Sequence, residues 1–398
     1  MRSAIRNILA ASVAGTFVLA AGAASAEDVK VGIILGFTGP LESITPGMAA
    51  SAELAWKEVN DSGLLADKLV PVRVDSTCID SAAATAAAER LVTAEKVAAI
   101  MGADCSGVTT AVLNNVAVPN GVVMISPSAT SPALTEAKDN GFFFRTSPSD
   151  ARQGEVMTDM LVAQGVKSVA VTYTNNDYGK GFADAFGAAF KKAGGTVTIS
   201  APHEDGKGDY SAEVAALQAA GGDLLVVLGY VDQGGVGIIR AATESGAFEK
   251  FALGDGMYGQ SLIDAIGKDL EGTVGLIPAA EGEGADKFAA AAKAANIDPT
   301  SSYTGQSYDA AALIALAMQK AKSHDRTAIR DAVLDVANAP GEKILAGELA
   351  KGLQLLKDGK DIDYVGATNV ELIGPGEAAG TYREYVVKDG KYETVKFH

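Results

Sequence analysis

Histidine and cysteine, the residues that many metal centres and nucleophilic active sites use, are scarce in this sequence. The 398 residues include three histidines and two cysteines, and His203, His324 and His398 have no spacing that would hold zinc. The G-x-x-x-x-G-K-[ST] motif of phosphate-binding loops and the G-x-S-x-G motif of serine hydrolases are both absent. We therefore expect no catalytic activity, no metal and no cofactor, and we expect His203 to lie on the surface.

Positive charge and long apolar runs are also in short supply. The chain has 33 lysines and arginines against 49 acidic residues, which gives a net charge of −16 at pH 7. Because the basic residues are dispersed, we do not expect a nucleic-acid partner. After residue 26, no apolar run approaches the roughly 18 residues that a membrane-spanning helix needs. The acidic balance favours solubility and gives little information about a ligand.

Residues 1–26 have the organisation of a secretory signal peptide. A basic start with two arginines is followed by a largely apolar segment at residues 8–20 and by an A-x-A cleavage site at residues 24–26. We expect cleavage before Glu27 and export to the periplasm of a Gram-negative cell. Since neither cysteine lies near the cut, we expect a free, soluble protein rather than a lipid-anchored one.

The two cysteines, Cys78 and Cys105, each follow an apolar run. In an oxidising compartment such a pair favours a disulfide, and two separate buried thiols are the alternative. Both apolar runs have the character of parallel strands. We therefore expect the two cysteines to lie at the ends of neighbouring strands.

Strand-like and helix-like segments alternate along the chain after the signal peptide. Nearly continuous apolar strands between amphipathic helices predict parallel sheets that are covered on both faces. The alternation starts again near Val166, which predicts two doubly wound lobes of like topology. After Pro278 we expect helices, including one over residues 342–358, and a final hairpin with its turn at Asp389-Gly390. This tail shows no obvious sheet of its own, so we expect it to complete both lobes and to cross between them at a hinge.

The stretch MISPSATSPALT, residues 124–135, places hydroxyl groups directly after an apolar strand. Ligands of open α/β sheets bind beyond the carboxyl ends of the strands, beside helix N-termini that favour negative charge. Ser126, Ser128 and Thr130 are therefore suited to hold an anion such as a carboxylate, and Ser106 lies on a neighbouring loop. Helix capping and turn formation explain the same hydroxyls without a ligand. The pattern by itself favours that simpler explanation.

The corresponding loops of the second series carry aromatic and acidic residues, namely Tyr178, Tyr230, Tyr258, Asp232 and Asp255. An ammonium group suits a carboxylate flanked by aromatic faces. Carboxylate-binding loops in one lobe and ammonium-binding loops in the other predict an amino-acid site between the lobes.

Residues 254–259, GDGMYG, match the G-x-G-x-x-G fingerprint of dinucleotide-binding proteins. The motif lies late in the chain, and a dinucleotide cofactor is not expected outside the cytoplasm. A tight turn that lets the backbone approach a ligand is the better explanation of these glycines.

In this combination the chain resembles the periplasmic leucine/isoleucine/valine-binding proteins of ABC transporters, which are type I periplasmic binding proteins. The resemblance runs from about Val29 to the C-terminus. Its motifs, in order, are GFTGP (36–40), Cys78, GADCSG (102–107), MISPSATSPALT (124–135), DYGKG (177–181), GY (229–230) and GDG (254–256).

The resemblance implies an α/β fold of two Rossmann-like, doubly wound lobes that are joined by a three-segment hinge and close around a ligand. It also implies a disulfide between the two cysteines. The expected boundaries are 1–26 for the signal peptide, 27–146 plus 279–372 for the N-terminal lobe, and 147–278 plus 373–398 for the C-terminal lobe.

Eight residues match ligand-binding positions of the family: Ser106, Ser128, Ala129, Thr130, Tyr178, Tyr230, Asp255 and Tyr303. The resemblance implies that the first four bind the ligand carboxylate, that the tyrosines line the pocket, and that Asp255 binds the α-ammonium. Ile44, nearest to an aromatic position of the family, and Asp232 are further candidates. Asp255 is one methylene shorter than the family's glutamate, and Tyr303 stands in place of a phenylalanine, so the identity of the ligand side chain stays open.

The implied function is capture of an amino acid, such as a branched-chain or other small aliphatic one, by a monomeric, non-enzymatic protein. That protein would deliver the amino acid to an ABC-transporter permease in the inner membrane. Relatives with this fold also bind amides, urea, γ-aminobutyrate and aromatic acids, which stay open as alternatives. A periplasmic sensory protein is another alternative, and a periplasmic amide hydrolase is a weaker one because a nucleophile motif is missing.

Overall fold

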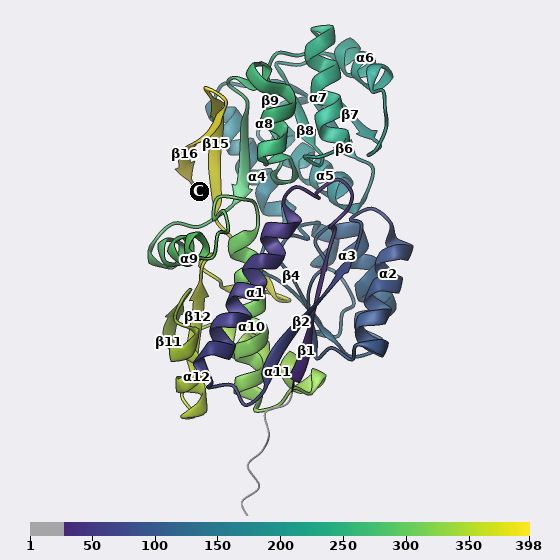
Figure 1. Cartoon of the computed structure of the whole chain (residues 1–398). Coiled ribbons are helices and arrows are strands. Elements are labelled where there is room, and N and C mark those ends of the chain that lie inside the picture. Colours follow the sequence, from purple (N-terminus) through teal and green to yellow (C-terminus); the bar gives the residue numbers. More distant parts are fainter. Residues whose placement is uncertain (1–27) are drawn as a thin grey trace, which may run out of the picture.

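The computed structural model describes residues 28–398, which form two large sheets with helices around each (Figure 1). The predicted signal peptide lies outside the described residues. Within them, none of the helices has both the length and the hydrophobicity that a bilayer crossing requires. The two sheets confirm the predicted pair of α/β lobes.

The first sheet has seven strands in the order β13-β14-β5-β4-β3-β1-β2. Its strands are β1 (Asp28–Leu35), β2 (Lys68–Asp75), β3 (Ala99–Gly102), β4 (Val123–Ser126), β5 (Phe143–Arg145), β13 (Leu372–Ile373) and β14 (Glu377–Ala378). Strands β1 to β5 pair in parallel, with Gly32 of β1 opposite Ile100 of β3. β3 and β4 are buried along their whole length, which agrees with their continuous apolar sequences.

The first lobe's helices are α1 (Thr45–Ser62), α2 (Ser81–Glu89), α3 (Ser106–Val112), α9 (Glu283–Ala294), α10 (Thr304–Ala321), α11 (Arg326–Ala337) and α12 (Leu349–Lys357). α10 is buried on nearly every side because it packs against α1, α11 and α12 as well as the sheet. The indole Nε1 of Trp56 in α1 donates to the carbonyl of Ala311 in α10 at 2.9 Å. This contact gives the buried tryptophan a packing role.

The second sheet has the order β16-β15-β10-β9-β8-β6-β7. Its strands are β6 (Ser168–Thr174), β7 (Thr196–His203), β8 (Leu224–Leu228), β9 (Phe251–Leu253), β10 (Val274–Pro278), β15 (Tyr382–Lys388) and β16 (Lys391–Phe397). The surrounding helices are α4 (Asp150–Ala163), α5 (Asp177–Lys192), α6 (Ser211–Ala220), α7 (Gly234–Ser245) and α8 (Gln260–Ile266). β15 and β16 form the predicted C-terminal hairpin, and β15 pairs antiparallel with β10.

The tail of the chain differs from the prediction in two places. The expected helix over residues 342–358 is a strand, β11 (Glu342–Leu345), followed by α12, and β11 pairs in parallel with β12 (Ile362–Gly366) in a small sheet of its own. The third passage between the sheets lies at residues 379–381 rather than after residue 372, because β13 and β14 still pair with the first sheet. Strands of two to four residues are too short to show a hydrophobic period.

His203 is buried at the end of β7, with 1% of its surface exposed, so the predicted surface position is wrong. Its Nδ1 lies 2.9 Å from the hydroxyl of Thr172. The loop after β8 covers the ring, since a Cβ placed on Gly229 would lie 3.0 Å from Nε2. Burial lowers the pKa of His203 to about 4, so the ring is neutral at physiological pH.

Cys78 and Cys105 form a disulfide, as predicted. The two cysteines follow β2 and β3, which are not direct neighbours, because β1 lies between them. The bridge therefore crosses over the end of β1. Gly36 leaves the space for it, since a Cβ at that position would lie 3.1 Å from the Cβ of Cys78.

The disulfide should stabilise the first lobe without setting the affinity of the cleft. A bridge across a sequence separation of 27 residues stabilises by about 3.5 kcal/mol in the chain-entropy model. We expect the double variant C78S/C105S to unfold at lower urea concentration by about that free energy and to keep its affinity for a ligand within a few-fold. Unchanged urea unfolding would contradict the stabilising role.

Candidate functional site

The loops that carry the predicted residues lie where the two lobes meet (Figure 1). Those from the first lobe follow β1, β3 and β4, and those from the second lobe follow β6, β8 and β9. Direct bonds join the two sets, such as the amide of Asp232 donating to the carbonyl of Pro40 at 3.1 Å. Of the eight predicted residues, Ser128 is half-buried and the other seven are buried.

The hydroxyls of the first lobe have two different roles. Ser126 donates to the carbonyl of Ala103 at 2.5 Å and accepts from the amide of Ala129, and Ser128 donates to the carbonyl of Asp104 at 3.0 Å. These groups shape the loop, as the explanation without a ligand expects. The buried hydroxyl of Thr130, in contrast, makes no hydrogen bond of normal geometry within the described residues.

Ser106 keeps a free donor although it already has one partner. Its hydroxyl oxygen accepts from the amide of Ser131 at 3.1 Å, and no acceptor for its proton is found within the described residues. Ser106 begins α3, and its side chain is buried. A hydroxyl donor is thus available at this end of the site.

Arg145 stabilises the hydroxyl-rich loop of residues 126–135 through hydrogen bonds from its guanidinium. Its buried guanidinium donates Nη1 to the carbonyls of Ala129 at 3.0 Å and Ser131 at 2.9 Å. Nη2 donates to Thr135 at 2.8 Å and pairs with Glu377 at 2.5 Å. The cation is therefore committed to the loop and to Glu377.

An acid and its tyrosines form the second-lobe side of the site. Asp255 follows β9, and its Oδ1 accepts from the hydroxyl of Tyr178 at 2.8 Å. The rings of Tyr178 and Tyr230 stack with their centroids 5.3 Å apart. The glycines of the GDG motif allow this closeness, since a Cβ on Gly254 would lie 3.0 Å from the Tyr178 hydroxyl, and one on Gly256 would lie 2.6 Å from the carbonyl of Gly229.

Tyr303 reaches the same acid from the segment before α10. Its backbone is left-handed, with φ of 62°, and its hydroxyl donates to Oδ2 of Asp255. The hydroxyl that distinguishes Tyr303 from phenylalanine therefore binds Asp255. Each oxygen of Asp255 receives one tyrosine hydroxyl.

Asp150 is a second buried acid beside Asp255, and sequence reasoning missed it. It begins α4 with 0% of its surface exposed, and neither carboxylate oxygen makes a hydrogen bond of normal geometry within the described residues. Its own amide donates to the carbonyl of Thr130 at 2.8 Å, which fixes it against the hydroxyl-rich loop. In the sequence, Ser149-Asp150 has the pattern of an ordinary helix start, and that pattern hides any other role.

The two acids perturb each other. Burial raises the pKa of Asp150 well above its usual range and the charge of Asp255 raises it further, while the nearby Thr130 hydroxyl and Arg145 lower it. Burial also raises the pKa of Asp255, and the hydroxyls of Tyr303 and Tyr178 oppose that rise. Two close buried carboxylates titrate as a coupled pair that resists holding two charges. A positively charged group placed between them would relieve that repulsion.

Gln153 completes the surroundings of Asp255 from one turn further along α4. With its amide oriented to match its neighbours, its nitrogen donates to Oδ1 of Asp255 and its oxygen accepts from the Asp255 amide, both at 3.2 Å. This side chain was not predicted, since a glutamine inside an amphipathic helix gives no sequence sign of a contact with another loop.

Two of the weaker candidates contact other groups. Asp232 accepts from the amide of Ser43 at 2.9 Å and from the hydroxyl of Ser261 at 2.6 Å. Tyr258 packs against Tyr392, with ring centroids 4.1 Å apart. Ile44 is buried at the start of α1 and lines a cavity of about 440 Å³ at the edge of the lobe contact. A ligand-binding role for these residues and for the eight main candidates stays a prediction.

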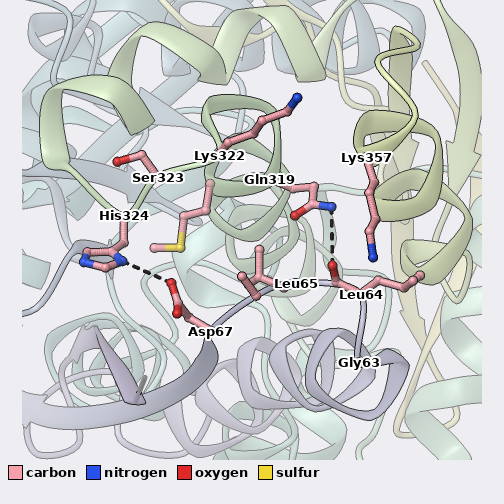
Figure 2. A pocket seen from close by; sticks show the side chains of 11 residues that line it. Gly63, Leu64, Leu65, Asp67, Gln319, Lys322, Ser323, His324 and Lys357 are labelled. Carbon is pink, nitrogen blue, oxygen red and sulfur yellow. Dashed lines mark hydrogen bonds and ion pairs between the residues drawn. The ribbon is translucent and has the colours of Figure 1, made fainter. Parts of the chain in front are cut away.

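A separate cavity of about 640 Å³ lies in the first lobe between the segment after α1 and the end of α10 (Figure 2). Residues 63–67 and the end of α10 line it, the amide of Gln319 donates to the carbonyl of Leu64 at 3.4 Å, and Nδ1 of His324 lies 3.1 Å from a carboxylate oxygen of Asp67. α10 begins beside Tyr303 and ends at this cavity, about 25 Å away at 1.5 Å per residue. None of the predicted ligand-binding residues lines it.

The described residues offer one cluster with the composition of a metal site, Cys78, Asp104 and Cys105. Its two sulfurs are joined in the disulfide and are not available as thiolates. Asp104 is bonded to the amide of Gly36 and to the hydroxyl of Ser76, both at 2.8 Å. These residues do not fit a metal ion.

Comparison with known proteins places this geometry in context. Residues 28–344 match the model of a family described as periplasmic binding protein. The chain is 30% identical over 323 residues to a Leu/Ile/Val-binding protein homolog of Brucella melitensis, which covers 80% of this chain and 86% of that protein.

Two solved structures share the fold. A leucine-binding protein from Thermotoga maritima has a TM-score of 0.78 at 24% identity, covering 93% of this chain and 98% of the other. A solute-binding protein of an ABC transporter from R. palustris, in complex with 4-hydroxybenzoate, has a TM-score of 0.76 at 17% identity, covering 94% and 97%.

The raised pKa of Asp150 predicts a pH-dependent stability. Such a group stabilises the folded chain below its unfolded pKa of about 3.9, and this contribution is lost as the pH rises through the folded value. We expect Asp150→Asn to raise the melting temperature of ligand-free protein at about pH 8, with a smaller gain at about pH 5. Each pKa unit of the shift is worth about 1.4 kcal/mol.

The matched control is Asp159→Asn, on the exposed face of the same helix. It should leave the melting temperature unchanged at both pH values. An equal effect of the two substitutions, or a gain for Asp150→Asn that does not depend on pH, would show that burial does not destabilise the ionised carboxylate of Asp150.

Proposed function

This chain belongs to the periplasmic binding protein family, in the type that serves branched-chain amino acid ABC transporters, and we propose that it binds a free amino acid between its lobes. The observation that carries the proposal is the buried pair of Asp150 and Asp255. In the folded chain the pair needs a cationic partner, and Arg145 is already committed to carbonyls and to Glu377. The α-ammonium of an amino acid supplies that partner.

The opposite end of the site supports binding of the ligand carboxylate. The hydroxyl of Ser106 has a proton to donate and its side chain is buried, whereas the hydroxyl of Thr130 lies beside Asp150 and lowers the pKa of that acid. A donor at Ser106 and the pair of acids match the two charged groups of a zwitterion. The lobes supply different parts of the site, so a ligand that touches both favours the closed arrangement.

We propose a small aliphatic amino acid as the ligand, in line with the names of the relatives. The hydroxyls of Tyr178 and Tyr303 are engaged with Asp255, which leaves their apolar rings as the larger part of the surroundings of this acid. Amides, urea and γ-aminobutyrate are alternatives that keep a donor for the acids.

An aromatic acid is the second candidate, because one structural neighbour holds 4-hydroxybenzoate. A ligand of that kind brings a carboxylate but no ammonium. It would fit this site only with the acid pair protonated, which the raised pKa of Asp150 makes accessible at low pH. The amino acid remains the better match at neutral pH, since it removes the charge repulsion without a proton.

The proposal includes a place and a partner. The predicted signal peptide and the family support a periplasmic protein, and the relatives support delivery to an inner-membrane permease. That the protein acts as a monomer is part of the proposal. A sensory protein of the same fold would use the same site. An amide hydrolase is disfavoured because the relatives are named as binding proteins.

Removing the charge of Asp255 should cost affinity. We expect Asp255→Asn to weaken binding of L-leucine by more than about tenfold in isothermal titration calorimetry, since a charged hydrogen bond in a closed cleft is lost. Asp269→Asn, an exposed aspartate of the same lobe, is the control and should bind as the unmodified protein does. Equal affinities for the two variants would remove Asp255 from the ligand site.

A further inference from the structure

A cluster of hydrogen bonds joins the lobes outside the proposed ligand site. It connects the loop between β1 and α1 with the loop after β8 and the start of α8. The amide of Asp232 donates to the carbonyl of Pro40 at 3.1 Å, and the amide of Ser43 donates to Oδ2 of Asp232 at 2.9 Å. The hydroxyl of Ser261 donates to Oδ1 of Asp232 at 2.6 Å and lies 3.3 Å from the hydroxyl of Ser43. We call these four residues the clasp.

The carboxylate of Asp232 is the centre of the clasp. Each of its oxygens accepts one bond, one from each lobe, and its own amide reaches back to the first lobe. Bonds to an ionised acceptor are stronger than neutral ones. The bonds from Ser43 and to Pro40 exist only while the lobes touch, so the free energy of this contact belongs to the closed state alone.

A second place in the sequence also favours close contact between the lobes. Gly181 of α5 lies against Ser131 and Pro132 of the first lobe, and a Cβ on it would come within 3.0 Å of both. The absence of a side chain at this position therefore lets the helix approach the hydroxyl-rich loop. A larger residue would hold the lobes apart.

We propose that Asp232 is a positioning residue that sets how long the lobes stay shut, without touching the solute. The inference rests on the proposed function, in which binding closes the lobes. A contact made only in the closed state multiplies the affinity for every ligand by the same factor, because it shifts the open–closed equilibrium and not the ligand contacts. Its effect falls mainly on the rate of release, since opening must precede release.

This role explains why an acid is present at the edge of an amino-acid site but bonded elsewhere. The position of Asp232 is accounted for without a ligand contact, since its two oxygens accept bonds from Ser43 of the first lobe and from Ser261 of the second. Substitutions in the clasp would therefore change the affinity for every ligand by one factor and leave the preference for one ligand over another unchanged.

The test compares Asp232→Ala with Asp264→Ala, an exposed aspartate on the helix that begins beside Ser261. We expect Asp232→Ala to raise the dissociation constants of L-leucine and L-isoleucine by the same factor, about five- to twentyfold, for loss of the one inter-lobe bond that its carboxylate accepts, from the amide of Ser43. The release rate in stopped flow should account for most of this change, and the melting temperature of ligand-free protein should fall only slightly, because the bond from Ser261 within the second lobe is also lost. Asp232→Asn, which keeps one acceptor, should be intermediate, and Asp264→Ala should match the unmodified protein.

Two results would overturn the proposal. Unchanged affinity and release rate for Asp232→Ala would show that the clasp contributes nothing to closure. A changed ratio between the leucine and isoleucine affinities would show that Asp232 contacts the ligand instead. Gly181→Val should imitate Asp232→Ala in lowering both affinities by one factor, and loss of only one affinity would contradict the shared cause.

A failure of the proposed function gives a different result. If the unmodified protein binds neither amino acid, the proposed ligand is wrong, and the clasp is then decided without a ligand by the double variant S43C/S261C. The two introduced thiols should crosslink under mild oxidation, as mass spectrometry of peptides would show, because the replaced hydroxyls lie 3.3 Å apart. The control S43C/S245C has its second thiol at the end of α7 and should not crosslink. An absence of crosslinking in S43C/S261C would overturn the clasp.

Discussion

Two buried carboxylates that repel each other when both are ionised are the main physical constraint on the candidate site of this protein. Asp150 and Asp255 are buried side by side, and each raises the cost of ionising the other. Hydrogen bonds to Asp255 from the hydroxyls of Tyr178 and Tyr303 and from the amide of Gln153 offset part of that cost. In the proposed function a ligand supplies the rest, and the site is selective for a compound that brings a positive charge.

The fold accounts for how these groups meet. Asp150 begins α4 just after the chain first passes from one sheet to the other, Asp255 follows a strand of the second sheet, and Tyr303 precedes the long buried helix of the first lobe. No single lobe holds the full set. The proposed ligand site therefore exists only when the two lobes are together, and the clasp proposed at Asp232 would add to the free energy of that arrangement.

Hydrophobic periodicity was sufficient for most of the fold. Apolar strands between amphipathic helices predicted both sheets, because burial on two faces leaves a long and regular trace in the sequence. The alternation around Asp389-Gly390 predicted the hairpin, and the oxidising compartment together with the family resemblance predicted the cysteine pairing. Periodicity failed for β11, β13 and β14, which span two to four residues and depend on pairing partners far along the chain. Contacts of that kind leave no local pattern.

The site was accessible from the sequence only in part. Loops after strands and family motifs located Asp255 and the tyrosines, since those residues follow recognisable elements. Asp150 was hidden because an acid at the first turn of a helix is commonplace, and only the three-dimensional structure shows that its oxygens lack partners. Asp232 was placed near the site, but the sequence could not distinguish a bond to a solute from a bond to the facing lobe.

The pH dependence of L-leucine affinity tests the central claim most directly. If the ligand ammonium relieves the repulsion between the two acids, binding must release protons, so calorimetry should show weaker binding at about pH 5 than at about pH 8. Titrations in buffers of different ionisation enthalpy would count those protons. Affinity that is unchanged or that rises on acidification would contradict the account and would favour an anionic ligand without an ammonium group, such as 4-hydroxybenzoate.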